Sequence, residues 1–211
     1  MAGNTDEVIY RDFEERDIDD LALLLASIWS PVGEKKIQLE VGTVDLANYA
    51  KRTTFARVAE LNGHVIGIVA ARSGDATDED NYWKKLSDKA YAKIEEISVE
   101  GAKTLAGYYE FEDRVHDKMH SETPQDLTYE LVLFAVSEVA RGKGVGSTLL
   151  KSAVDYLKGE GATSAFLYTD TTCNWQYYEK RGMDRIAEYK STDEELKEGR
   201  PEEMYIYSCN L

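Results

Sequence analysis

Arg141-Gly142-Lys143-Gly144-Val145-Gly146-Ser147 is the stretch that decides the fold. Six consecutive apolar residues, 131–136, come before it and predict a buried strand. Apolar residues recur at helical spacing after it, over 145–157, and predict a helix. A strand, a glycine-rich turn and a helix start direct unpaired backbone N–H groups and the positive end of a helix dipole at one point. We expect an anion to bind there, and specifically a phosphate.

The composition of this turn favours a phosphate ligand over a purely structural turn. Alternating glycines permit left-handed backbone conformations and leave room for a pyrophosphate. Arg141 and Lys143 add positive charge to a chain whose formal net charge is −15. The two common nucleotide motifs do not match, because no Gly-Lys-Ser/Thr occurs and the glycines are spaced Gly-x-Gly-x-Gly rather than Gly-x-Gly-x-x-Gly.

The turn and a segment downstream resemble the GNAT superfamily of acetyl-CoA-dependent N-acetyltransferases. Arg141, Gly144 and Gly146 match its Arg/Gln-x-x-Gly-x-Gly/Ala signature after a strand. The segment 175–183, Trp-Gln-Tyr-Tyr-Glu-Lys-Arg-Gly-Met, resembles the family's aromatic-Tyr-Glu-Lys-x-Gly-Phe segment. The N-terminal strands and first helix are similar as well, so the resemblance covers most of the chain except about 74–127.

The elements predicted along the chain alternate between strands and helices. This order predicts an α/β fold with a mixed sheet. The resemblance implies that it is the α/β (α+β) fold of the GNAT type, with a mixed, mostly antiparallel sheet flanked by helices, in a single N-acetyltransferase domain over residues 1–211. The predicted strands are 7–12, 54–61, 64–72 (joined to the strand before it by a turn at Asn62-Gly63), 128–136, 163–169, 183–189 and 203–209, and the predicted helices are 17–29, 43–51, 144–158 and 174–181.

Residues 74–127 depart from the family pattern, which usually has a short loop there. We expect a helical insertion whose aromatic residues either pack it onto the core or form a wall of an amine pocket. Acids alternate with the aromatics, among them Glu95, Glu96, Glu110 and Glu112, and form a surface able to hold an organic cation. His116 and His120 stand four residues apart, but no His-Glu-x-x-His surrounds them, so we expect a solvated helix face and no metal.

Acetyl transfer to an amine needs a base for the ammonium proton and an acid for the departing thiolate. The resemblance implies that Tyr178 is the acid, with a core tyrosine as the alternative. It implies that Glu130 is the base, since the histone-acetylating branch carries its base at the same distance from the signature. A solvent-facing strand-edge glutamate is the alternative there, and many relatives use a water chain instead. Cys173 has no His or acid partner visible nearby and is expected to be a passive thiol.

Acetyl-CoA is the co-substrate that the resemblance implies. Its pantetheine arm would lie between the strands 131–136 and 163–169. Asn174 either completes the contacts or caps the following helix. The residues expected to bind acetyl-CoA are Phe134, Ala135, Val136, Arg141, Gly142, Lys143, Gly144, Val145, Gly146, Ser147, Asp170 and Asn174.

The whole chain excludes several classes of function. At 211 residues with 43% hydrophobic content it is long enough for a full core. No apolar run approaches the length of a transmembrane helix, and the polar N-terminus does not resemble a secretory signal. Two cysteines without Cys-x-x-Cys spacing favour free thiols in the reducing cytoplasm. The acidity argues against nucleic-acid binding and tolerates a cationic substrate.

The sequence therefore predicts a cytoplasmic N-acetyltransferase that moves an acetyl group directly from acetyl-CoA to a primary amine on a small molecule, peptide or protein. The alternative is a catalytically silent CoA-binding sensor, which the presence of Tyr178 and Glu130 disfavours. A NAD-type enzyme would need a second nucleotide half, which we do not find. No membrane partner is expected, and homodimerisation is left open.

Overall fold

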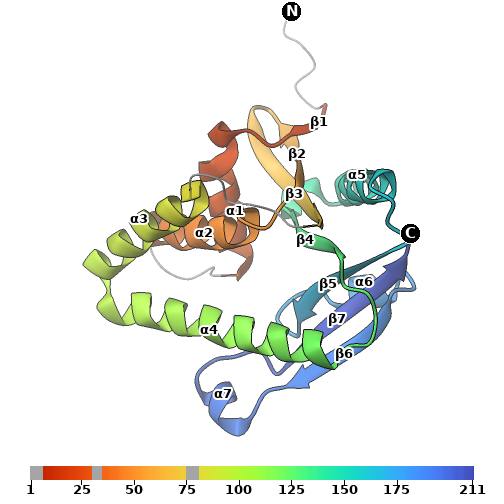
Figure 1. Ribbon diagram of the computed structural model, residues 1–211. Helices are drawn as coiled ribbons and strands as arrows, with labels where there is room; N and C mark the ends of the chain where they lie inside the picture. The colour runs from red at the N-terminus through yellow and green to blue at the C-terminus, as the bar shows by residue number, and fades with distance from the viewer. Residues whose placement is uncertain (1–6, 30–34, 75–80) are drawn as a thin grey trace, which may run out of the picture.

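The computed structural model describes residues 7–29, 35–74 and 81–211, and its centre is one seven-stranded sheet in the order β1-β2-β3-β4-β5-β7-β6 (Figure 1). The strands are β1 (Ile9–Asp12), β2 (Phe55–Leu61), β3 (His64–Ser73), β4 (Tyr129–Val136), β5 (Ser164–Asp170), β6 (Asp184–Lys190) and β7 (Glu203–Asn210). The helices are α1 (Ile18–Trp29), α2 (Lys35–Ala50), α3 (Tyr82–Ile97), α4 (Val99–Glu122), α5 (Val145–Gly159), α6 (Gln176–Glu179) and α7 (Asp193–Lys197).

The sheet is antiparallel at every strand pair except one, which confirms the expected mixed, mostly antiparallel sheet. β2 and β3 form a hairpin whose turn residues, Asn62 and Gly63, have φ of 56° and 82°. Two successive residues in the left-handed region are what an Asn-Gly hairpin turn requires. The predicted turn is therefore confirmed.

The exception is β4 with β5, a parallel pair that shares a single register position, Glu130 opposite Phe166. β4 pairs with β3 along its length, with one irregularity: Leu131 and Leu133 face consecutive residues of β3, and Val132 is the extra residue of a bulge. A bulge interrupts pairing and increases the local twist. β4 and β5 consequently part from the bulge toward their carboxyl ends.

Helices cover both faces of the sheet (Figure 1). α5 packs on one face, against side chains that include Leu167 and Tyr207. α1 and α2 cover β2 to β4 on the other face. α4 extends that second layer over β5, β7 and β6, because its buried residues contact Phe166 and Ile206. Successive side chains of a strand point to opposite faces of the sheet, so Phe166 and Ile206 lie on the face covered by α4, and Leu167 and Tyr207 lie on the face covered by α5.

The predicted helical insertion is confirmed as α3 and α4, with 75–80 outside the described residues. Ser98 begins α4 and its Oγ accepts a hydrogen bond from the N–H of Gly101 at 2.9 Å. α3 packs on α2 through Ala90 and Ile94. The insertion is thus part of the packed core, which was one of the two predicted alternatives.

Two predicted helices have different lengths in the structure. The helix expected at 43–51 begins at Lys35, because the preceding residues are good helix formers. The helix expected at 174–181 is only Gln176–Glu179, since Gly182 takes a left-handed φ of 74° and ends it. Within the described ranges, no helix combines the length and apolar character that membrane crossing requires.

Candidate functional site

The glycine-rich turn starts α5 with its backbone N–H groups uncapped by any side chain. Gly142 and Gly144 have φ of 75° and 72°, a conformation that favours glycine, and Gly144 is the N-cap. A Cβ added at either glycine would meet no described atom within 4 Å. The space in front of the helix start is therefore open, as a phosphate site requires.

Gly146 allows α5 to approach β4 closely. A Cβ at this position would lie 3.3 Å from the ring of Phe134. That ring is half-buried, and its centroid is 5.8 Å from that of Tyr177. Gly146 thus brings the helix start beside the carboxyl end of β4, where β4 and β5 part.

Three cationic side chains surround this turn. Arg141 is 78% exposed and pairs with the equally exposed Glu138 at 2.7 Å, a contact of little energy that water competes for. Lys143 is exposed. Arg181, which the sequence analysis did not single out, donates to Ser147 Oγ at 3.4 Å and lies 4.1 Å from the ring centroid of Tyr177. It occupies the variable position of the Tyr-Glu-Lys-x-Gly segment, so its basic character was the signal available.

Tyr178 lies on α6 among the core residues that face α5. Its ring centroid is 5.6 Å from Tyr177 and 5.9 Å from Tyr207. Within the described residues its hydroxyl makes no hydrogen bond, unlike that of a core-anchoring tyrosine. Burial, and then the neighbouring thiol of Cys173, raise the pKa of Tyr178 above its usual range. The hydroxyl therefore stays protonated at neutral pH, as a general acid must; that role remains a prediction.

The segment after β5 holds the other residues expected near the cofactor. Burial, and then Asp170, raise the pKa of Cys173 to about 11, so the thiol is neutral and a poor nucleophile. Asp170 is 9% exposed, and its Oδ1 accepts from the N–H and hydroxyl of Thr172, both at 2.6 Å. The N-cap of α6 is Trp175, without a side-chain cap, so capping does not explain Asn174. Cofactor contacts by Asp170 and Asn174 remain predictions.

Glu130 is buried between two cations. It is 1% exposed, its Oε1 pairs with Arg52 at 2.6 Å and its Oε2 pairs with Arg72 at 3.1 Å. The alternative of a solvent-facing strand-edge glutamate is thereby excluded. Each carboxylate oxygen already accepts a guanidinium N–H, so Glu130 is held firmly in place. Its assignment as the base remains a prediction.

A second group of acids lies where α2 and α4 meet the end of β5. Glu112, on α4, is 8% exposed and makes no hydrogen bond or ion pair within the part of the chain that the structure describes. Its pKa is raised to about 7, chiefly by burial. The positive charge of Arg52 lowers this pKa, whereas the negative charges of Asp113, Asp170 and Asp45 raise it further. Sequence reasoning included Glu112 only in a general acidic surface.

Asp45, on α2, is buried beside this glutamate and was not anticipated from the sequence. Its carboxylate accepts a hydrogen bond from the hydroxyl of Tyr109. Burial raises the pKa of Asp45 to about 6, although that hydrogen bond lowers it. No motif marks Asp45, since it is one of several acids on an amphipathic helix.

His116 corrects the expectation of a solvated helix face. Its ring stacks on Tyr168 of β5 with centroids 3.8 Å apart. Burial, with help from Arg52, lowers the pKa of His116 to about 3, so the ring is neutral. Packing against β5 thus takes this position away from solvent, while His120 is exposed. Among the described residues, no three His, Cys, Asp or Glu side chains gather as a metal site would need.

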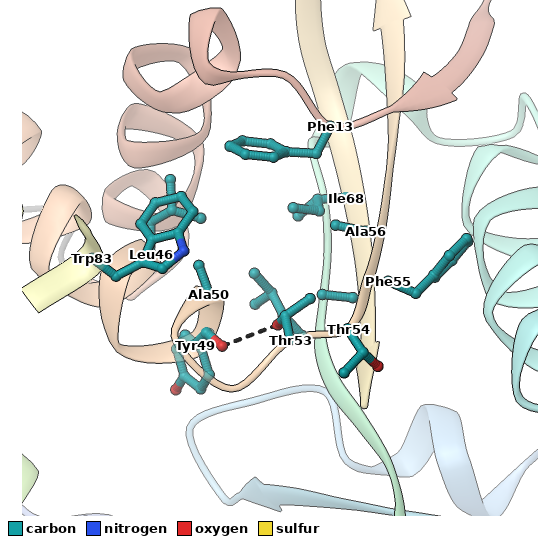
Figure 2. Close-up of a pocket in the computed structure, with 12 residues that line it drawn as sticks. Phe13, Leu46, Tyr49, Ala50, Thr53, Thr54, Phe55, Ala56, Ile68 and Trp83 are labelled. Carbon is teal, nitrogen blue, oxygen red and sulfur yellow. Dashed lines mark hydrogen bonds between the residues drawn. The ribbon is translucent and has the colours of Figure 1, made fainter. Parts of the chain in front are cut away.

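An apolar cleft of about 220 Å³ lies between α2, α3 and the sheet (Figure 2). Phe13, Trp83 and Ala50 point into it, whereas the ring of Phe55 points away and stacks on Tyr156 at 4.6 Å. Tyr49 lines the cleft and is also within electrostatic range of Glu112. The guanidinium of Arg52 lies 5.6 Å from the Tyr49 ring centroid. Tyr49 therefore joins the apolar cleft to the acidic group.

Comparison with known families matches residues 24–183 to the acetyltransferase (GNAT) family. The chain belongs to the GNAT acetyltransferase family. Acetyl-CoA, the expected co-substrate, is the acetyl donor of this family. Comparison with curated protein sequences gave no match.

Solved structures share the GNAT fold with this chain. PH1933 from Pyrococcus horikoshii OT3 has a TM-score of 0.57 at 13% identity, over 97% of this chain and 99% of its own. The mosquito protein described as arylalkylamine N-acetyltransferase like 5b has a TM-score of 0.53 at 15% identity, over 97% of this chain and 100% of its own. A GNAT family acetyltransferase from Elizabethkingia anophelis, solved with acetyl-CoA bound, has a TM-score of 0.50 at 15% identity, over 98% of this chain and 99% of its own. The predicted fold is confirmed.

Proposed function

We propose that this GNAT protein transfers the acetyl group of acetyl-CoA to a primary amine while both substrates are bound. The observation that carries the proposal is the parting of β4 from β5 beside the uncapped start of α5. Separated strands leave backbone N–H and C=O groups of β4 in need of partners, and the amides of a pantetheine arm are suitable partners.

The residues around this opening fit acetyl-CoA. Backbone groups of Phe134, Ala135 and Val136 would hold the pantetheine arm, and the turn 141–147 would hold the pyrophosphate. Arg181 adds a cation beside Ser147 that the sequence analysis did not include. When bound, acetyl-CoA supplies a thioester, whose carbonyl carbon accepts the amine. Holding both substrates in one site removes the entropic cost of their encounter.

Two proton transfers fall to the protein. The amine must lose a proton before its lone pair can form the C–N bond, and the thiolate released when the C–S bond breaks gains one. We assign the second transfer to Tyr178, whose hydroxyl is protonated and free of other hydrogen bonds within the described chain. A water chain or a carboxylate takes the first. Glu130 is the carboxylate that the sequence suggested, but its oxygens are already engaged by Arg52 and Arg72.

The acceptor is a primary amine on a small molecule, peptide or protein, and we propose a cytoplasmic enzyme. The test has two parts. Calorimetry should show that acetyl-CoA binds the wild-type chain and that Gly144→Asp abolishes binding, because a carboxylate would stand where phosphates bind. Gly144→Asn is the matched control, since asparagine tolerates a left-handed backbone and adds no charge.

Thiol release from acetyl-CoA is then followed with a panel of primary amines. Release with at least one amine is the expected result. Binding of acetyl-CoA without release for any amine would favour a silent CoA-binding module. Absence of acetyl-CoA binding would refute the proposal altogether.

A further inference from the structure

We propose that the buried acids where α2 and α4 meet the carboxyl end of β5 bind the ammonium group of the acceptor, and that Glu112 takes the proton which the ammonium must lose. This inference rests on the proposed acetyl transfer and assigns its base. It also gives the insertion a catalytic part, since Glu112 lies on α4.

Glu112 is a buried acid without a partner. It sits on α4 between Phe111 and Val115, both core residues, and is itself only 8% exposed. No hydrogen bond or ion pair to it exists in the described chain. Burying an unpaired carboxylate is costly, and proteins normally avoid it by pairing the group. A cationic ligand would supply the missing partner.

The surroundings of Glu112 favour a cation. Asp45 and Asp170 both act on it electrostatically, and only one oxygen of Asp170 is occupied by hydrogen bonds in the described chain. Arg52 also acts on Glu112, but it is held at 2.6 Å by Glu130, which it shares with Arg72. Arg52, Arg72 and Glu130 together carry one net positive charge, which is fewer than the negative charges of Glu112, Asp45 and Asp170 when these are ionised.

Aromatic rings complete the ammonium site. Tyr49 and Tyr108 both lie within electrostatic range of Glu112. Ring faces attract organic cations, so these tyrosines suit an ammonium group without carrying charge themselves. Tyr49 also borders the apolar cleft, which can take the hydrocarbon body of the same amine (Figure 2).

Cys173 links the acid to the surroundings of the base. This residue acts electrostatically on Tyr178 and on Tyr108, and Tyr108 is in turn within electrostatic range of Glu112. In the reaction an N–H bond of the ammonium breaks and its proton passes to Glu112. The amine lone pair then forms the C–N bond, the thioester C–S bond breaks, and the thiolate takes the proton of Tyr178. The nitrogen loses its second proton as the amide forms, and this proton restores the hydroxyl of Tyr178.

Several groups set the proton affinity of Glu112. Asp45 and Tyr49 of α2, Tyr108, Tyr109 and Asp113 of α4, Asp170 at the end of β5 and Arg52 after α2 interact with it electrostatically. Together with burial they place the pKa of Glu112 at about 7. A carboxylate with that pKa accepts a proton far more readily near neutral pH than an ordinary glutamate does.

The test compares Glu112→Gln with Glu110→Gln, an exposed acid on the same helix. With the best amine of the panel, Glu112→Gln should lower kcat/KM by about 10²-fold or more, the range for loss of a general base. Its pH–rate profile should lose the acid limb near pH 7. Acetyl-CoA binding, measured by calorimetry, should be unchanged, and Glu110→Gln should behave as wild type in each measurement.

The possible results separate the two proposals. The amine's own ionisation is the same for every variant, so a limb that changes only in Glu112→Gln belongs to the protein. A wild-type profile and rate in that variant would refute the assignment of Glu112 while leaving acetyl transfer intact. If no amine is acetylated by the wild-type chain, the proposed function fails and the assignment fails with it. Loss of acetyl-CoA binding in Glu112→Gln would show a general structural defect and also refute the assignment.

Discussion

Glu130 is held by two arginines, and this arrangement predicts a structural cost for its removal. Glu130→Gln deletes the one negative charge that Arg52 and Arg72 share, and the side chains of these arginines are 30% and 21% exposed. We expect a loss of about 1–3 kcal/mol in the free energy of unfolding, because a partly buried pair loses one member. Chemical denaturation measures it.

Glu138→Gln is the matched control for this variant. Glu138 is 81% exposed and its ion pair with Arg141 is a surface contact, so its loss should change stability by no more than about 0.5 kcal/mol. The acid limb of the pH–rate profile should persist in Glu130→Gln if Glu112 is the base. A flattened limb in Glu130→Gln would instead support the assignment made from the sequence.

Tyr178 is expected to serve the departing thiolate. Tyr178→Phe keeps the ring packing with Tyr177 and Tyr207 and removes only the hydroxyl. Turnover should fall about 10²-fold or more, with little change in acetyl-CoA affinity. Steady-state kinetics and calorimetry provide the two measurements. Wild-type turnover would assign Tyr178 to core packing alone.

Sequence reasoning could find some site residues and not others, for a physical reason. The glycines of the turn and Tyr178 belong to contiguous segments whose local conformation determines their place. Glu112, Asp45 and Arg52 come from separate parts of the chain, and only the packing of α4 against α2 and β5 brings them together. Their partners and burial decide their chemistry, and neither property can be read from a local pattern.

At the level of elements, the crossing of α1 and α2 depends on one glycine. A Cβ on Gly42 would lie 1.8 Å from the carbonyl oxygen of Ala22, a fully buried residue. Gly42→Ala should force the helices apart and cost about 1–3 kcal/mol of stability. Gly159→Ala, with no described atom within 4 Å of the added Cβ, should be neutral or slightly stabilising. Thermal unfolding of the two variants distinguishes them; equal melting temperatures would contradict the close crossing.

The strands were predictable because their signals are local. Alternating or continuous apolar runs and the Asn62-Gly63 turn fixed β2 to β5 to within a few residues. The placement of α4 was not predictable in this way. Phe111, Val115 and Met119 could equally have served a lid, and only their burial against β5 and β7 shows that they are core. Deleting α4 would expose this sheet face, so point substitutions such as Glu112→Gln are the cleaner probes of the insertion.

For the whole molecule, the buried acids make stability depend on pH. Glu112, with a pKa of about 7 against an ordinary 4.5, binds a proton more tightly in the folded state than in the unfolded state. Its stabilising effect is present below pH 4.5 and is lost as the pH rises through 7. Asp45, with its pKa raised to about 6, affects stability in the same direction. The pKa of His116 is lowered to about 3, so this residue destabilises the folded state as the pH falls through 6.5.

These signs single out the interval from pH 6.5 to 8. Asp45 is by then largely deprotonated in both states, so Glu112 makes the largest contribution to the decline. His116 offsets part of it, because its ring is still half protonated in the unfolded state at pH 6.5 and loses that proton as the pH rises. Stability should fall by roughly 0.5 kcal/mol over this interval, which corresponds to about 1–2 °C in melting temperature for a chain of this size. Calorimetric melts at constant ionic strength measure it. Glu112→Gln should flatten the decline, whereas Glu110→Gln should retain it. An equal decline in all three proteins would mean that general repulsion in a chain whose formal net charge is −15 sets the pH dependence instead.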